Sequence, residues 1–106
     1  MLVTTTFDIA DKRITKTLGL VKGNTIRSRH VGRDIMAGLR GIVGGELHEY
    51  TKLLAESREQ ALDRMIEDAE RLGADAVIGV SFSTSVMSQG AAELMAFGTA
   101  VLIEDN

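Results

Sequence analysis

The stretch that decides the fold is ELHEYTKLLAESREQALDRMIEDAERL, residues Glu46–Leu72. It contains neither Pro nor Gly, and its second half carries apolar residues at spacings of three, four and three: Leu62, Met65, Ala69 and Leu72. Oppositely charged pairs four residues apart, such as Lys52 with Glu56, support the exposed side of a helix. Gly73 follows at once and suits the residue just past a helix end. The stretch predicts one long amphipathic helix.

Upstream of this helix, the sequence predicts two strands and a short helix. Residues 14–26 are rich in β-branched residues, and four of their apolar residues share one parity: Ile14, Leu18, Leu20 and Ile26. This pattern indicates a twisted strand that Gly19 and Gly23 interrupt. A shorter strand is expected at 2–6. Apolar residues on one helical face predict a short helix over 35–43, which ends at Gly44-Gly45.

Downstream of the long helix, the pattern is that of a hairpin. One set of residues is expected to point to one face of the first strand: Ala76, Ile78, Val80, Phe82 and Val86. The intervening Gly79, Ser81, Ser83 and Ser85 are expected on the other face. Residues 87–90 supply the turn, and the return strand at 91–103 is apolar on both parities, as in strands buried on both faces. The chain is therefore expected to be one α+β domain over 1–106, with order β-α-α-β-β and an antiparallel sheet packed on one long and one short helix.

Composition excludes several classes of protein. The net charge of −3 argues against a nucleic-acid-binding protein, which usually carries a strong basic excess. The absence of cysteine removes disulfides and thiolate metal sites and fits a reducing compartment. No signal peptide is evident at the N-terminus. The most apolar run, Leu94–Ile103, is about half the length of a membrane-spanning helix. We therefore expect a cytoplasmic protein with no membrane contact.

Two features indicate self-association. A helix over 46–72 would be ~40 Å long, whereas a compact chain of this size has a diameter of roughly 34 Å. The strand at 91–103 is apolar on both faces, but this chain supplies only one helical layer to cover it. A second copy of the chain would cover both. The alternative is a helix that is kinked near Gly44-Gly45 and a sheet with one face in water.

The sequence holds no assembled catalytic or metal-binding set. His30 and His48 are the only histidines, and Lys52 occupies the second ligand position of a zinc-binding HExxH pattern. Ser81 lies in a Gly-Val-Ser-Phe-Ser segment that lacks the second Gly of a nucleophile elbow. No cofactor-binding fingerprint occurs. We therefore predict no catalytic residues, no metal site within one chain, and no cofactor.

A cluster of basic residues stands out in this acidic chain: Arg27, Arg29, His30, Arg33 and Arg40. Arginine side chains match the geometry of carboxylate and phosphate groups, so the four arginines are a candidate anion site. The favoured interpretation is that they pair with acidic residues of the long helix, within the chain or from a neighbouring subunit. The sequence leaves both interpretations open.

Several segments together resemble the YbjQ-like family, small bacterial and archaeal proteins that are often labelled as heavy-metal-binding. They are Gly44-Gly45-Glu46 with Tyr50, Ala61, the run LGADAVIGV at 72–80, and GTAV at 98–101. The likeness spans essentially the whole chain. It implies a dodecin-like subunit, a ring of five copies, and Gly44, Gly45, Glu46 and Tyr50 as the family's site residues.

The resemblance supplies no biochemical activity, so three classes of function remain. The leading hypothesis is a homo-oligomeric binding or scaffold protein that holds an unidentified small ligand between subunits. The second is a metal-handling protein. The third, an enzyme, has the least support. For Glu46 and Tyr50, a structural role at the corner before the long helix competes with contact to a ligand, because a carboxylate at a helix start can cap free N–H groups.

Overall fold

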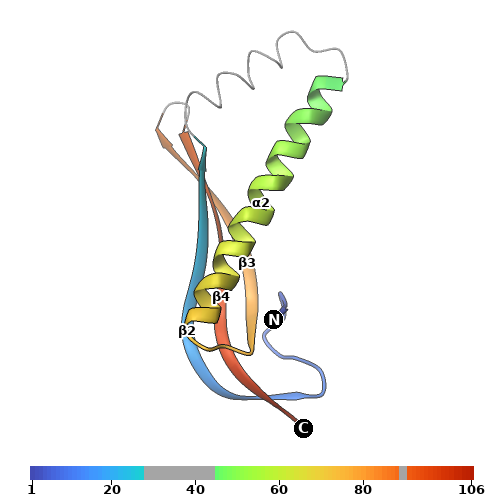
Figure 1. Ribbon diagram of the computed structural model, residues 1–106, viewed down its shortest axis with the longest axis vertical. Helices are drawn as coiled ribbons and strands as arrows, with labels where there is room; N and C mark the ends of the chain where they lie inside the picture. The colour runs from blue at the N-terminus through green and yellow to red at the C-terminus, as the bar shows by residue number, and fades with distance from the viewer. Residues whose placement is uncertain (28–44, 89–90) are drawn as a thin grey trace.

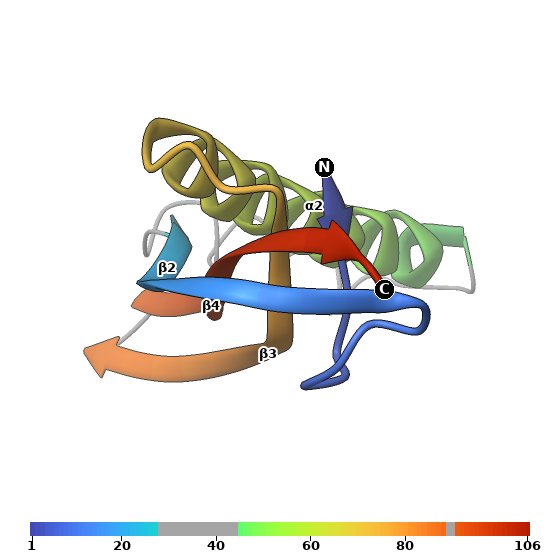
Figure 2. The same cartoon turned by 90° about the horizontal axis from the view of Figure 1, so that it is seen from below.

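The computed structural model describes residues 1–27, 45–88 and 91–106. They form strands β1 (Leu2–Val3) and β2 (Lys12–Arg27), helix α2 (Gly45–Arg71), and strands β3 (Ala76–Ser88) and β4 (Ala91–Asp105). The four strands make one sheet in the order β1-β3-β4-β2, and α2 lies on one face of it (Figures 1 and 2). The expected α+β class is confirmed. The predicted short helix at 35–43 lies outside the described residues.

The expectation of an antiparallel sheet was wrong at one edge. β2 with β4 and β3 with β4 are antiparallel, but β1 pairs with β3 in parallel, with Leu2 beside Ala76 and Val3 beside Val77. The reason is the path between the first two strands. After β1, the chain crosses to the other edge of the sheet and enters β2 beside β4 (Figure 2), so β1 and β2 are never neighbours.

The end of α2 agrees closely with the sequence. Gly73 has a φ of +75°, which L-residues with a Cβ rarely adopt. The amide of Ala74 donates to the carbonyl of Ala69 at 3.1 Å, and the amide of Gly73 donates to the carbonyl of Glu70 at 3.0 Å. This pair of bonds is the Schellman motif, which satisfies carbonyls at the helix end and turns the chain towards β3.

The main core lies between α2 and the sheet. Its buried residues come from all the long elements: Val21, Ala61, Met65, Ala69, Val77, Val80, Ala96 and Ala100. Gly23 of β2 is also buried. A Cβ at this position would collide with the backbone of α2 at Ala61 and Met65, so the helix lies directly against the strand. Gly23 therefore marks the closest approach of the two layers rather than a break in the strand.

A second, smaller cluster lies on the other face of the sheet. Ala76, Ile78 and Val101 are buried there, and Ile9, from the segment between β1 and β2, packs on them. The predicted common face of Ala76, Ile78, Val80 and Phe82 was wrong. The register of β3 shifts between Ile78 and Ser81, where Gly79 has a φ of +62°. This bulge moves Val80 into the main core while Ile78 stays on the opposite face.

β2 also contains bulges that change which face its residues lie on. Register shifts between Ile14 and Lys16 and between Thr17 and Gly19 change the face of the later residues. Leu18 consequently packs against the main core, while the Leu20 side chain is 67% exposed.

β4 is flanked by strands on both sides, and Ala100 and Val101 are buried on opposite faces. The expectation of burial on both faces is therefore confirmed at Ala100 and Val101, whereas Met95, Phe97 and Ile103 on the second face are only half-buried.

Candidate functional site

The predicted corner is described only in its backbone. α2 begins at Gly45, so Glu46 lies in its first turn and Tyr50 lies about one turn later. Gly44 lies outside the described residues. A carboxylate-bearing residue in the first turn of a helix is favourable in the field of the helix dipole. The choice between a structural and a ligand-binding role for Gly44, Gly45, Glu46 and Tyr50 stays a prediction.

The candidate anion site is likewise untested. Arg27 is the last residue of β2, one residue beyond the strand predicted from the sequence. Arg29, Arg33 and Arg40 lie outside the described residues, as does His30. Whether the arginines bind an anion or pair with acidic side chains stays open.

The features considered for metal binding or catalysis are not assembled in the described part of the chain. Among the side chains that the structure describes, those of residues 1–26, 55–85 and 93–106, no group of three or more His, Cys, Asp or Glu is placed to hold a metal ion. Ser81 lies in the interior of β3, with strand on both sides. A nucleophile elbow needs a sharp turn between a strand and a helix, so Ser81 does not occupy one.

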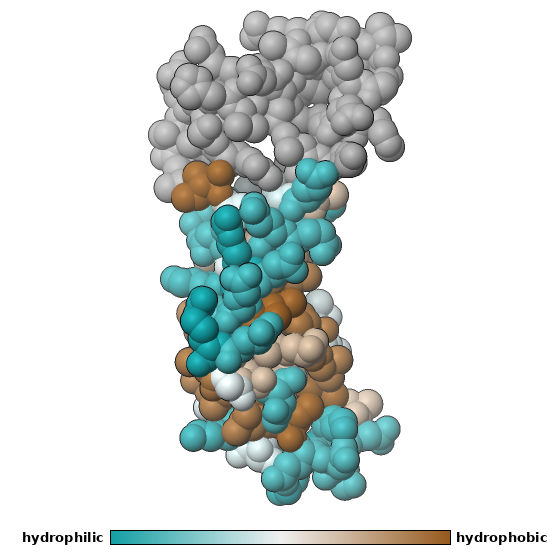
Figure 3. All heavy atoms as spheres, viewed as in Figure 1, coloured by the Kyte–Doolittle hydropathy of each residue, from teal (hydrophilic) through white to brown (hydrophobic). Residues whose placement is uncertain are grey.

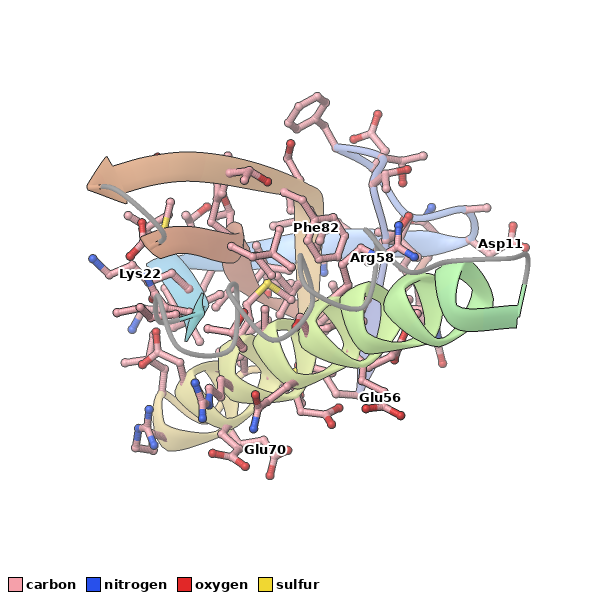
Figure 4. All side chains as sticks on the ribbon, turned by 90° about the horizontal axis from the view of Figure 1, so that it is seen from above. Asp11, Lys22, Glu56, Arg58, Glu70 and Phe82 are labelled. Carbon is pink, nitrogen blue, oxygen red and sulfur yellow. The ribbon has the colours of Figure 1, made fainter. Side chains whose placement is uncertain are left out.

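The outer face of α2 is a continuous acidic surface. Its exposed carboxylates recur every three or four residues: Glu56, Glu59, Asp63, Glu67 and Glu70. Figure 4 shows Glu56 and Glu70 on the side of the helix that faces away from the sheet. Like charges at these spacings disfavour the helix slightly. Packing of the opposite face therefore has to stabilise α2.

The helix leaves part of the apolar sheet uncovered. α2 packs on β2 and β4 and scarcely contacts β3. Phe82 of β3 pairs with Ala96, so its side chain lies on the helix side of the sheet, yet it is 45% exposed. Figure 3 shows hydrophobic surface next to the polar band of the helix, and Figure 4 labels Phe82 on β3.

A second exposed aromatic residue comes from the segment between β1 and β2. Phe7 packs its ring over Gly79, where the Phe7 Cε1 atom lies 2.7 Å from the position that a Cβ would take. The Phe7 side chain is nevertheless 77% exposed. Sequence reasoning missed both Phe7 and Phe82 as surface residues. The contact with Gly79 leaves no periodic signal, and the exposure of Phe82 depends on where α2 lies.

Ion pairs join the ends of β2 and β4. Arg13 Nη2 lies 2.7 Å from Glu104 Oε2, and the neighbouring Lys12 donates to Asp105. The hydrogen bond from Lys12 and its positive charge lower the pKa of the Asp105 carboxyl below its usual value. Both pairs are exposed, so they fix the register of the strand ends more than they stabilise the fold.

Comparisons with known proteins agree over nearly the whole chain. The sequence profile of the YbjQ family, described as "Putative heavy-metal-binding", matches residues 1–104. A UPF0145 protein of Methanosarcina acetivorans is 59% identical over 103 residues, which are 97% of each chain. The UPF0145 protein DET1617 of Dehalococcoides mccartyi is 57% identical over 104 residues, 98% of this chain and 100% of that one.

A solved structure shows the same fold. A protein of unknown function from Pediococcus pentosaceus, assigned to the DUF74 family, superposes with a TM-score of 0.64 at 18% identity and covers 98% of both chains. None of these descriptions states an enzymatic activity. Among the described residues, no helix is long and apolar enough to cross a membrane. The profile match over residues 1–104 and the identity to the UPF0145 relatives show that the chain belongs to the YbjQ family.

Proposed function

We propose that this chain is the subunit of a non-enzymatic homo-oligomer, a ring of five copies, that acts as a binding or scaffold protein. The observation that carries the proposal is the uncovered apolar surface beside α2. Phe82 is half-exposed on the face of the sheet that should be the core side. Leu20, which pairs with Thr99 and so lies on the opposite face of the sheet, and Phe7 are exposed as well. A second copy packed on the surface beside α2 would remove the Phe82 side chain from water.

The dimensions of the protomer support the proposal. Its radius of gyration is 17.2 Å, against ~13 Å for a compact chain of about 100 residues. The longest dimension is 56 Å and the shortest 18 Å. An elongated chain buries less surface than a compact one, and a chain of this length has little core to spare. Association with other copies would supply the missing burial.

A small ligand between subunits fits the chemistry of β3. On the face opposite Phe82, the strand presents small polar side chains, Ser81, Ser83 and Ser85. Hydroxyl groups beside apolar residues can orient a small molecule while the apolar surface binds it. The cytoplasm, where we place the protein, offers many such molecules, and the family resemblance does not select one.

Native mass spectrometry tests the assembly and its contents together. Five copies of 11.4 kDa give about 57 kDa, which we expect for protein taken directly from cells at micromolar concentration. Mass beyond that of the polypeptide would report a retained ligand. A species of 11.4 kDa would overturn the proposal, while a stable dimer would overturn the ring and keep self-association.

The alternative is metal handling, and the family description favours it. Because a ring multiplies each ligand, one histidine per chain could build a site on the symmetry axis. Zinc and copper titrations of the wild type beside His30→Ala and His48→Ala test this idea. Submicromolar binding that either substitution removes would establish the metal function, and the absence of such binding would exclude a tight histidine site.

A further inference from the structure

The edges of the sheet carry an unusual set of side-chain contacts. A strand at a sheet edge presents N–H and C=O groups that can pair with another extended chain, so proteins block such edges to avoid aggregation. In this protein the outer strands are β1 and β2, and β4 extends past the start of β3. The outer edges of β1 and β2, the part of β3 beyond the N-terminal segment and the end of β4 are therefore available for pairing.

The edge of β2 is blocked by α2. The amide N of Lys22, which points away from β4, donates to Asp68 Oδ2 at 3.1 Å. Two residues along, the outward carbonyl of Asn24 accepts a hydrogen bond from Arg64 Nη1. Asp68 and Arg64 are four residues apart, so they lie on the same side of the helix. One acceptor and one donor from α2 thus occupy two outward groups of the strand, the Lys22 amide and the Asn24 carbonyl.

The edge of β4 is blocked in the same way from the loop before β3. The amide of Asp75 donates to the carbonyl of Val101 at 3.0 Å, which continues the β3–β4 ladder by one residue. β3 begins at Ala76, so the residues of β4 beyond Val101 have no partner in β3. There the Asp75 side chain forms the next hydrogen bond to β4. Its Oδ2 accepts the amide of Ile103 at 3.0 Å. As at Lys22, a carboxylate accepts the hydrogen bond of an amide that another strand could otherwise pair with.

The start of β3 is closed by backbone rather than side chains. Beyond β1, the carbonyl of Thr4 accepts a hydrogen bond from the amide of Val80 at 3.0 Å. The carbonyl of Thr6 accepts one from the amide of Gly79 at 2.8 Å. These bonds follow the bulge at Gly79 and carry the N-terminal segment along the strand. Side chains therefore cover two outward groups of β2 and one of β4, and the N-terminal segment covers the start of β3.

We propose that Asp68 and Asp75 are edge guards, carboxylates that stop the sheet from pairing edge to edge with a strand of another copy. An incoming strand would have to displace a charge-assisted hydrogen bond, which is stronger than a neutral one. It would also bring its own carbonyl oxygens towards a negative charge. The inference does not depend on the proposed ring, because it concerns which contacts the chain avoids.

The test compares Asp68→Ala and Asp75→Ala with Asp68→Asn and Asp75→Asn. An Asn side-chain oxygen still accepts the edge amide, whereas Ala leaves it open. In hydrogen exchange, we expect the Lys22 amide in Asp68→Ala and the Ile103 amide in Asp75→Ala to exchange about tenfold faster than in the wild type. Thioflavin T fluorescence and light scattering should then show new assemblies above the wild-type mass in both Ala variants, and not in the Asn variants.

Two control variants distinguish the loss of an edge carboxylate from a general loss of stability. Asp63→Ala removes an exposed carboxylate from α2 and should change neither readout. Val77→Ala leaves the edges intact and lowers the melting temperature through the core. The proposal is overturned if Val77→Ala forms the same assemblies at an equal loss of melting temperature. It is also overturned if the Ala variants keep the wild-type mass, or if their edge amides exchange at the wild-type rate.

Discussion

Gly23 is the residue at which the two layers of the molecule meet most closely. A Cβ there would meet the carbonyl oxygen of Ala61 and the amide nitrogen of Met65, and backbone atoms of a helix cannot rotate away. We expect Gly23→Ala to lower the free energy of unfolding by about 3 kcal/mol, at the upper end for an overpacked core. Urea denaturation gives the value. Lys22→Ala, next to it on the strand with an exposed side chain, is the control, and a Gly23→Ala variant as stable as that control would refute the packing.

The role of Gly23 shows the limit of sequence reasoning at this scale. A glycine in a strand pattern indicates either an interruption or a close approach of another backbone. The sequence prediction chose an interruption, because the pattern of β2 alone does not show where α2 will lie. Gly73 was predicted correctly, because its role depends only on the helix that precedes it. Local signals can be predicted, while contacts between distant segments require the fold.

Asp105 gives a prediction for the pH dependence of stability. Its pKa is lowered in the folded protein by Lys12. A carboxylate with a depressed pKa contributes stability that is present above its unfolded value, near 3.8, and is lost as the pH falls through the folded value. The difference in melting temperature between wild type and Asp105→Asn should therefore shrink as the pH falls from 6 towards 2. Because the pair is exposed, the difference should also shrink in high salt, and a difference that stays constant with pH would contradict the assignment.

Among the elements, α2 depends on the way it ends. Gly73 has a φ of +75° within the Schellman motif, and nothing lies within 4 Å of the position that a Cβ would take. The cost of Gly73→Ala is therefore conformational alone. We expect a loss of about 1 kcal/mol in the free energy of unfolding. Chemical denaturation measures it, with Glu70→Ala on the exposed face as the matched control; equal stability of the two variants would count against the motif.

The elements themselves could largely be predicted, and their faces could not. The predicted helix at 46–72 and the observed α2 at Gly45–Arg71 differ by one residue at each end. The hairpin strands also agree with β3 and β4. The predicted faces of the strand residues are wrong after Gly79 and near Gly19. Each bulge there inserts a residue and inverts the alternation of the residues that follow. β1 was expected as a short strand, but its parallel pairing depends on a crossing that no local pattern encodes.

On the scale of the whole molecule, faces and edges have different roles. The guarded edges of β2 and β4 discourage pairing through the backbone, whereas the uncovered surface around Phe82 offers side-chain burial. If both proposals hold, copies associate through faces and avoid edges. This division would permit a closed assembly and disfavour open-ended growth, because edge pairing extends a sheet without limit.

Phe82 is the residue that tests this picture most directly. It is half-exposed on the helix side of the sheet, and an interface between copies would bury it. We expect Phe82→Glu to weaken the assembly, because a desolvated carboxylate without a partner is costly at an interface. Light scattering over a range of concentrations should show lower mass at low concentration, and circular dichroism should show the secondary structure retained at high concentration, where copies still meet.

The control is Ser85→Glu, which adds the same charge to the same strand at an exposed position of the opposite parity. Because Ser85 lies opposite Glu93 on β4, the melting temperature of this variant is measured beside its mass. Its mass should equal that of the wild type if the copies pack through the Phe82 surface and the serine face only lines the ligand cavity between them. If Phe82→Glu also keeps the wild-type mass at every concentration, this surface takes no part in self-association. If Ser85→Glu dissociates the assembly and Phe82→Glu does not, the copies pack on the face opposite α2. The second outcome would move the interface to the face where Ser81, Ser83 and Ser85 lie, and a ligand between subunits would then contact these hydroxyl groups.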